Sequence, residues 1–75
     1  MAYDTYISSD KAIMLGKPCI TGTRITVELI LKKMGEGANV IDLIEAYPHI
    51  SEVQILAAIQ YAAAVIANDE FLLLA

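Results

Sequence analysis

The chain has 75 residues, of which 57% are apolar, and its formal net charge is −4 at pH 7. A chain of this length forms a single domain, residues 1–75, and buries only about 60% of the surface that it exposes when unfolded. Soluble domains usually contain about 45–50% apolar residues, so the excess cannot all fit inside one small monomer. We therefore expect a homodimer or a higher oligomer.

Cysteine content and hydropathy exclude several classes of protein. Cys19 is the only cysteine, so no internal disulfide can form, and no second soft ligand lies near it in the sequence. We expect no metal and no other cofactor. The longest apolar stretch, residues 55–67, is interrupted by Gln60 and is shorter than the ~20 residues of a membrane span. Residues 1–5 lack the basic start and apolar core of a signal peptide, which favours a cytoplasmic protein that does not enter the membrane.

Charge is distributed unevenly along the chain. All five basic residues precede residue 34, where three acids oppose them, so this part carries +2. The remainder contains six acids and no base, which gives −6. A polyanion such as DNA would therefore have to contact the N-terminal half.

Residues 1–25 form the predicted strand and turn region. Residues 3–15 alternate loosely between apolar and polar side chains, which is typical of short strands or irregular chain. Pro18 removes a backbone donor and favours an extended chain through Ile20. Gly22 then allows a tight turn.

Residues 26–68 form the predicted three-helix unit. The first helix should begin near Thr26, whose hydroxyl can accept from the free amides, and should end at Gly35 or Gly37. The second should begin after Asn39 as its N-cap and end before the Tyr-Pro pair at 47–48.

The third helix should begin after Ser51 and run to about residue 67. Ser51 and Gln54 have the spacing of a capping box. Residues 69–75 form a tail that either extends this helix, forms an edge strand or stays mobile. The three helices, with a short connection between the last two, predict a mainly α fold of the helix-turn-helix type with a short N-terminal β region.

The stretch GKPCITGTRI at residues 16–25 invites a catalytic interpretation that its spacing excludes. Five residues separate Gly16 from Gly22, whereas a phosphate loop needs four and then Gly-Lys-Ser/Thr. His49 and Cys19 are single residues of their kind, and the acids do not form a metal cluster with them. We therefore expect no enzyme.

The third helix allows two interpretations. In a helix-turn-helix it would enter the DNA major groove, where Gln54 can contact adenine, while Lys17, Lys32 and Lys33 contact phosphates. However, the helix itself contains no lysine or arginine. It is apolar on every side, which predicts burial against a second helix. The oligomer interface predicted on this helix consists of Ile55, Ile59, Ala62 and Ile66.

Arg24 also has two interpretations. Its five N–H donors either tie loop carbonyls together or point at carboxylates of a partner.

Residues 16–63 resemble the family of small bacterial and archaeal proteins known as domain of unknown function 433. The matching residues include Gly16-Lys17-Pro18, Gly22-Thr23-Arg24-Ile25, Tyr47-Pro48 and Tyr61-Ala62. The resemblance implies a homeodomain-type helix-turn-helix fold. It also implies similarity to antitoxins of type II toxin-antitoxin pairs, which bind and silence a PIN-like ribonuclease and in some cases repress their own operon.

These observations lead to one main hypothesis and two alternatives. The main hypothesis is an antitoxin-like inhibitor that presents either Thr23 and Arg24 or the apolar tail to a toxin. The tail residues concerned are Phe71, Leu72 and Leu73. The alternatives are a helix-turn-helix regulator that binds promoter DNA by itself and a structural oligomerisation module.

Overall fold

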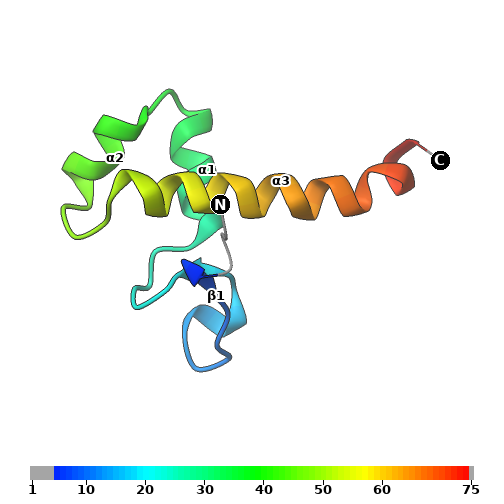
Figure 1. Cartoon of the computed structure of the whole chain (residues 1–75), viewed down its shortest axis with the longest axis horizontal. Coiled ribbons are helices and arrows are strands. Elements are labelled where there is room, and N and C mark those ends of the chain that lie inside the picture. Colours follow the sequence, from blue (N-terminus) through cyan, green and yellow to red (C-terminus); the bar gives the residue numbers. More distant parts are fainter. Residues whose placement is uncertain (1–4, 75) are drawn as a thin grey trace.

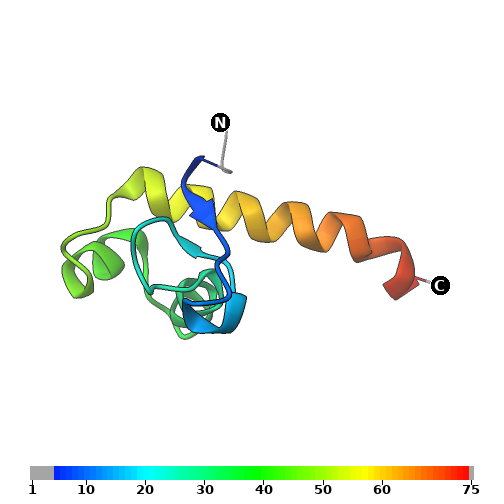
Figure 2. The same ribbon diagram turned by 90° about the horizontal axis from the view of Figure 1, so that it is seen from below.

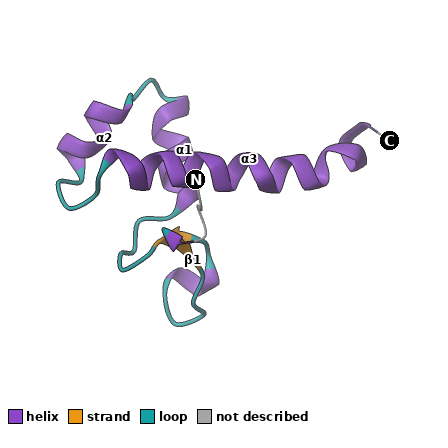
Figure 3. Cartoon of the chain, in the orientation of Figure 1, coloured by secondary structure: helices purple, strands orange, loops and turns teal. Residues whose placement is uncertain are grey.

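The computed structural model describes the chain from residue 5 to residue 74, with side chains described from residue 5 to residue 68. Six elements follow one another along the chain: β1 (Ile7–Ser8), the 3-10 turn η2 (Met14–Gly16), β2 (Cys19–Ile20), α1 (Val27–Gly35), α2 (Val40–Ala46) and α3 (Glu52–Leu74). Figure 3 shows that helices dominate and that the strands are confined to the start of the chain. The predicted fold class, mainly α with three helices and a short N-terminal β region, is confirmed.

The N-terminal region is a small antiparallel sheet extended by a tight hairpin. β1 pairs with β2 so that Ile7 lies opposite Ile20. The chain then turns back, and the Ile20 amide donates to the carbonyl of Ile25 at 2.9 Å. Gly22 lies in this turn with φ of 82°, a left-handed conformation that costs glycine little. Residues 16–25, which contain the conspicuous glycines, therefore lead into and form a hairpin.

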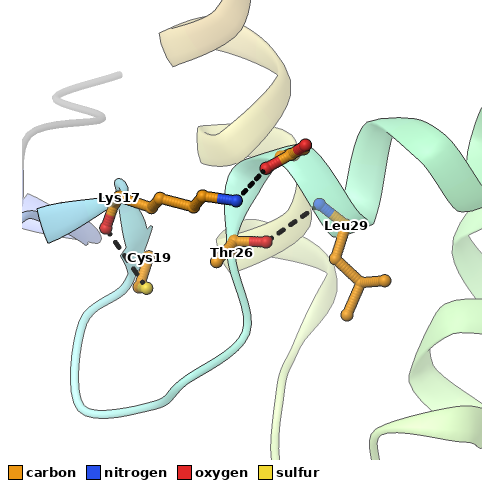
Figure 4. A network of polar contacts seen from close by, with 5 residues as sticks. Lys17, Cys19, Thr26 and Leu29 are labelled. Carbon is orange, nitrogen blue, oxygen red and sulfur yellow. Dashed lines mark hydrogen bonds and ion pairs between the residues drawn. The ribbon is translucent and has the colours of Figure 1, made fainter. Parts of the chain in front are cut away.

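Side-chain and backbone caps set both ends of α1. The Thr26 hydroxyl accepts from the Leu29 amide at 3.0 Å, as Figure 4 shows. At the other end Gly37 has φ of 110°, and its amide donates to the carbonyl of Met34 while the next amide donates to that of Lys33. This pattern is a Schellman motif, which needs a left-handed residue at the Gly37 position.

The next two helices begin where the sequence predicts. Asn39 and Asp42 form a reciprocal capping box at α2, with bonds of 2.8 and 2.9 Å. At α3 the Gln54 side-chain oxygen accepts from the Ser51 amide at 2.7 Å, which is one half of the predicted capping box. α3 continues as a helix to Leu74, well past the predicted end near residue 67. Up to residue 74, the predicted tail is therefore a continuation of α3.

The core contains one large, fully buried side chain from each of four elements. These are Ile20 of β2, Ile30 of α1, Leu43 of α2 and Ile55 of α3. The other elements gather along the N-terminal half of α3, whereas its C-terminal half projects beyond them (Figures 1 and 2). None of the described helices combines the length and the hydropathy needed to cross a membrane.

Conservative shortening of core and surface isoleucines should separate their contributions to stability. Ile30 is fully buried and Ile41 is 66% exposed. We expect Ile30→Val to lower the free energy of unfolding by about 0.5–1.5 kcal/mol, because it removes a buried methylene. Ile41→Val should change it by less than about 0.5 kcal/mol. Denaturant titration followed by circular dichroism measures both, and equal losses would contradict the assignment of the core.

Candidate functional site

Thr23 fixes the shape of the hairpin turn. Its hydroxyl donates to the carbonyl of Ile20 at 2.7 Å and accepts from the amide of Ile25 at 3.0 Å. Both hydrogen bonds stay inside the hairpin, and the side chain is half-buried. The hydroxyl of Thr23 is thus engaged within the hairpin, where it holds the turn that presents the next residue, and a contact of Thr23 with a partner stays a prediction.

Arg24 follows in this turn and is exposed to solvent. Among the residues that the structure describes, its guanidinium makes no hydrogen bond and no ion pair. The interpretation in which Arg24 ties loop carbonyls together therefore has no support in the described part of the chain. Its donors are available to a group outside the molecule.

A shallow hollow of about 260 Å³ lies beside Arg24 at the start of α1. It is lined by Met14, Arg24, Thr26, Glu28, Leu29 and Lys32. The structure therefore brings together two cations that the sequence analysis had assigned to different roles, Arg24 to a protein partner and Lys32 to DNA. An anionic group entering this hollow would meet both of them.

Glu28, the acid in this hollow, already has a partner. The Lys17 ammonium lies 2.9 Å from its carboxylate (Figure 4). This hydrogen bond and the charge of Lys17 lower the pKa of Glu28, with a smaller contribution from the charge of Lys32. Both side chains of the pair are exposed, so the pair adds little to stability. Its main effect is to neutralise the acid that would otherwise offset Arg24 and Lys32.

The η2 turn contributes an apolar part of the site that the sequence analysis did not find. Met14 and Leu15 have φ of 51° and 60°, a left-handed conformation that is unfavourable for residues with a β-carbon. Leu15 is 93% exposed, and Met14 lines the hollow with Arg24. The sequence analysis treated these residues as ordinary strand or irregular chain. Gly16 directly after them was the one available signal for a left-handed turn.

Backbone hydrogen bonds hold the η2 turn in this conformation. Asp10 and Ile13 form an isolated bridge, and the Gly16 amide donates to the carbonyl of Ile13 at 3.0 Å. The Lys17 amide donates to the carbonyl of Met14 at 3.2 Å. Strained backbone persists only where the surrounding structure enforces it, and it often accompanies a binding surface. The turn thus presents a leucine side chain to solvent at a fixed place.

The four residues predicted to contact DNA do not form one surface of free polar groups. Lys17 is paired with Glu28, and Lys33 lies 3.9 Å from Glu36. The Gln54 side-chain oxygen is bonded to the Ser51 amide at the start of α3. Lys32 lies at the hollow beside Arg24. DNA binding stays a prediction that these contacts do not favour.

The predicted oligomer residues lie in different environments along α3. Ile55 is fully buried in the core of its own chain, so the prediction that it contacts a second copy is wrong. Ile59 and Ala62 are half-buried against that core. Ile66 is 59% exposed and remains available to a second copy. The predicted partner residues Phe71, Leu72 and Leu73 belong to the part of α3 whose side chains lie outside the described set.

Cys19 and His49 take no part in a cluster of reactive groups. Cys19 is buried, and its thiol donates to the carbonyl of Lys17 at 3.4 Å (Figure 4). His49 is exposed in the loop between α2 and α3. Within the described side chains, no group of three or more histidines, cysteines or acids is arranged to hold a metal ion.

Comparison with known proteins identifies the family. The family described as "Protein of unknown function (DUF433)" matches residues 7–62. The chain belongs to this family. The resemblance drawn from residues 16–63 is thereby confirmed, and the match extends back to β1. No curated protein and no solved structure matched the chain. The matched span contains the whole hairpin, η2 and the part of α3 that packs on the other elements of this DUF433 protein.

Replacement of Lys17 should change the titration of Glu28. We expect Lys17→Ala to raise the pKa of Glu28 towards its ordinary value, because the variant loses the hydrogen bond and the charge that lower it. Since the folded-state pKa is the lower one, the stabilisation from the pair is present above the unfolded-state pKa. It is lost as the pH falls through the folded-state pKa.

NMR titration of the Glu28 carboxyl measures this shift directly. Added salt should reduce it in the wild type, because exposed charges are screened. Lys11→Ala removes an equal charge without touching the pair and serves as the control. Identical Glu28 titrations in wild type and Lys17→Ala would contradict the assignment.

Proposed function

We propose that this DUF433 protein is a cytoplasmic antitoxin-like inhibitor that binds a PIN-like ribonuclease and blocks its active site. The observation that carries the proposal is Arg24, an exposed guanidinium without a partner among the described residues, on a turn held by hydrogen bonds. A PIN-type active site is a cluster of carboxylates that hold a divalent metal. An arginine supplies positive charge and paired donors of the geometry that carboxylates accept.

Inhibition then follows from competition for the carboxylates. A guanidinium inserted among them takes the place of the metal charge, and without the metal no water is activated for attack on the RNA phosphate. Thr23 fixes the turn on both sides of Arg24, so little backbone freedom is lost when the complex forms. Lys32 lies at the same hollow and adds a second positive charge facing an acidic partner.

The η2 turn supplies the apolar anchor of the proposed interface. Binding energy in protein interfaces concentrates in a few residues, with arginine enriched among them, that are buried at the centre of the contact. Met14 shares the hollow with Arg24, and Leu15 is the most exposed of the large apolar side chains in the described part of the chain. We infer that Leu15 enters an apolar recess of the toxin beside its carboxylates.

Co-expression with the product of the neighbouring gene, followed by pull-down and a ribonuclease assay, tests the proposal. We expect a complex in which ribonuclease activity is suppressed. Arg24→Ala should weaken the complex by about 2–5 kcal/mol and restore RNA cleavage, because the carboxylates lose their paired charge. Lys33→Ala removes the same charge from a residue that does not line the hollow, and it should inhibit like the wild type. A wild-type chain that forms no complex would refute the function.

Truncation before Asp69 separates the two partner surfaces suggested by the sequence. The truncated chain retains the hairpin and η2, so it should inhibit like the full chain if Arg24 carries inhibition. If the complex is lost on truncation and kept in Arg24→Ala, the partner surface lies at the end of α3 instead.

Leu15→Gly should increase stability while it weakens the complex. Glycine adopts a positive φ without the steric cost of about 1–2 kcal/mol that a β-carbon brings, though it also loses more conformational freedom on folding. We expect a net gain of up to about 1 kcal/mol in the free energy of unfolding. The complex should bind at least ~10-fold more weakly, because a buried leucine contact is removed.

Chemical denaturation and calorimetric titration of the same Leu15→Gly sample measure both effects. The matched control for binding is Ile41→Ser, which removes an exposed apolar side chain from α2. Glycine is not used at this position because it would destabilise the helix. If Leu15→Gly bound the toxin with wild-type affinity, Leu15 would not be part of the interface. The proposed role of Arg24 would be unaffected by that result.

A further inference from the structure

One apolar stripe runs along α3 and continues past the body of the protein. Its members recur at the spacing of one helix face: Ile55, Ala58, Ile59, Ala62, Val65 and Ile66. The first of them are buried or half-buried against the other elements. Val65 is 41% exposed and Ile66 is 59% exposed. The change comes where α3 projects beyond the other elements (Figures 1 and 2).

The exposed part of the stripe borders an apolar groove of about 270 Å³. One wall consists of Pro18, Val27 and Leu31. The other consists of four α3 residues, Tyr61, Ala62, Val65 and Ile66. The charged residue at the groove, Glu28, is paired with Lys17. Val65 and Ile66 thus form an apolar, partly exposed ridge along the α3 wall of this groove.

The surface of the chain is larger than a compact monomer of its size requires. Its accessible area is 5138 Å², whereas a folded monomer of 8.1 kDa exposes about 4,500 Å². Its radius of gyration is 12.7 Å, against about 11.4 Å for a compact domain of this length.

We propose that a second copy of this chain covers the groove, with the two α3 helices packed about a two-fold axis. In a two-fold dimer the same surface serves both copies, so each ridge enters the groove of the other. The α3 sequence from residue 53 to residue 68 carries no charged side chain, so over this stretch the two helices meet without like-charge repulsion. Ala62, which lines the groove, is small enough to permit close approach of the helices. This surface is separate from Arg24, and the proposal does not depend on the proposed function.

Sedimentation equilibrium and light scattering of the full chain test the dimer. We expect a mass of twice 8.1 kDa and a melting temperature that rises with protein concentration. Ile66→Asp should raise the dimer dissociation constant at least ~10-fold, because it removes a buried apolar contact and places a charge in the groove. Gln60→Asp introduces the same charge on an exposed position of α3 outside the groove and should leave the dimer intact.

Three results would overturn the proposal. The first is a wild-type mass of 8.1 kDa together with a melting temperature independent of concentration. This measurement needs no variant, so it decides the matter even if Ile66→Asp fails to fold. The second is a dimer in which a folded Ile66→Asp associates as tightly as the wild type. The third is equal dissociation of Ile66→Asp and Gln60→Asp, which would place the contact elsewhere on α3.

Discussion

The structure depends on a single small cluster of buried side chains shared by β2 and the three helices. Ile20, Ile30, Leu43 and Ile55 are fully buried and come from β2 and the three helices. A chain of this size has no second core, so each element is fixed mainly through this contact. The consequence for function lies in Ile20: because it belongs both to the core and to the hairpin, the exposed turn is anchored directly to the helices.

Hydrogen bonds in and after the hairpin then fix the backbone around the exposed, charged residue Arg24. Thr23 bridges the carbonyl of Ile20 and the amide of Ile25, and Thr26, immediately after the hairpin, caps α1. Arg24 therefore stands between two threonines whose hydroxyls are both hydrogen-bonded to the backbone. The backbone on both sides of Arg24 is thereby ordered in the free protein, which lowers the conformational cost of a contact made by this residue.

The sequence predicted those features that depend on short stretches of chain. Thr26, Asn39 and Ser51 begin the helices because their caps involve residues only three positions away. The sequence did not predict that Ile55 is buried whereas Ile66 is exposed. Both residues belong to one apolar stripe on α3, and only tertiary packing decides how much of that stripe the other elements cover. The left-handed turn at Leu15 was missed for a similar reason: hydrogen bonds around the turn hold it against its local preference.

The first turn of α1 separates the two surfaces assigned to partners. Glu28 borders both the hollow beside Arg24 and the groove beside α3, and its carboxylate is held by Lys17. A second copy seated in the groove would pack against Val27 and Leu31, the residues that flank the wall shared with the hollow. The proposed dimer contact and the proposed toxin contact therefore meet at Glu28, on opposite sides of the first turn of α1.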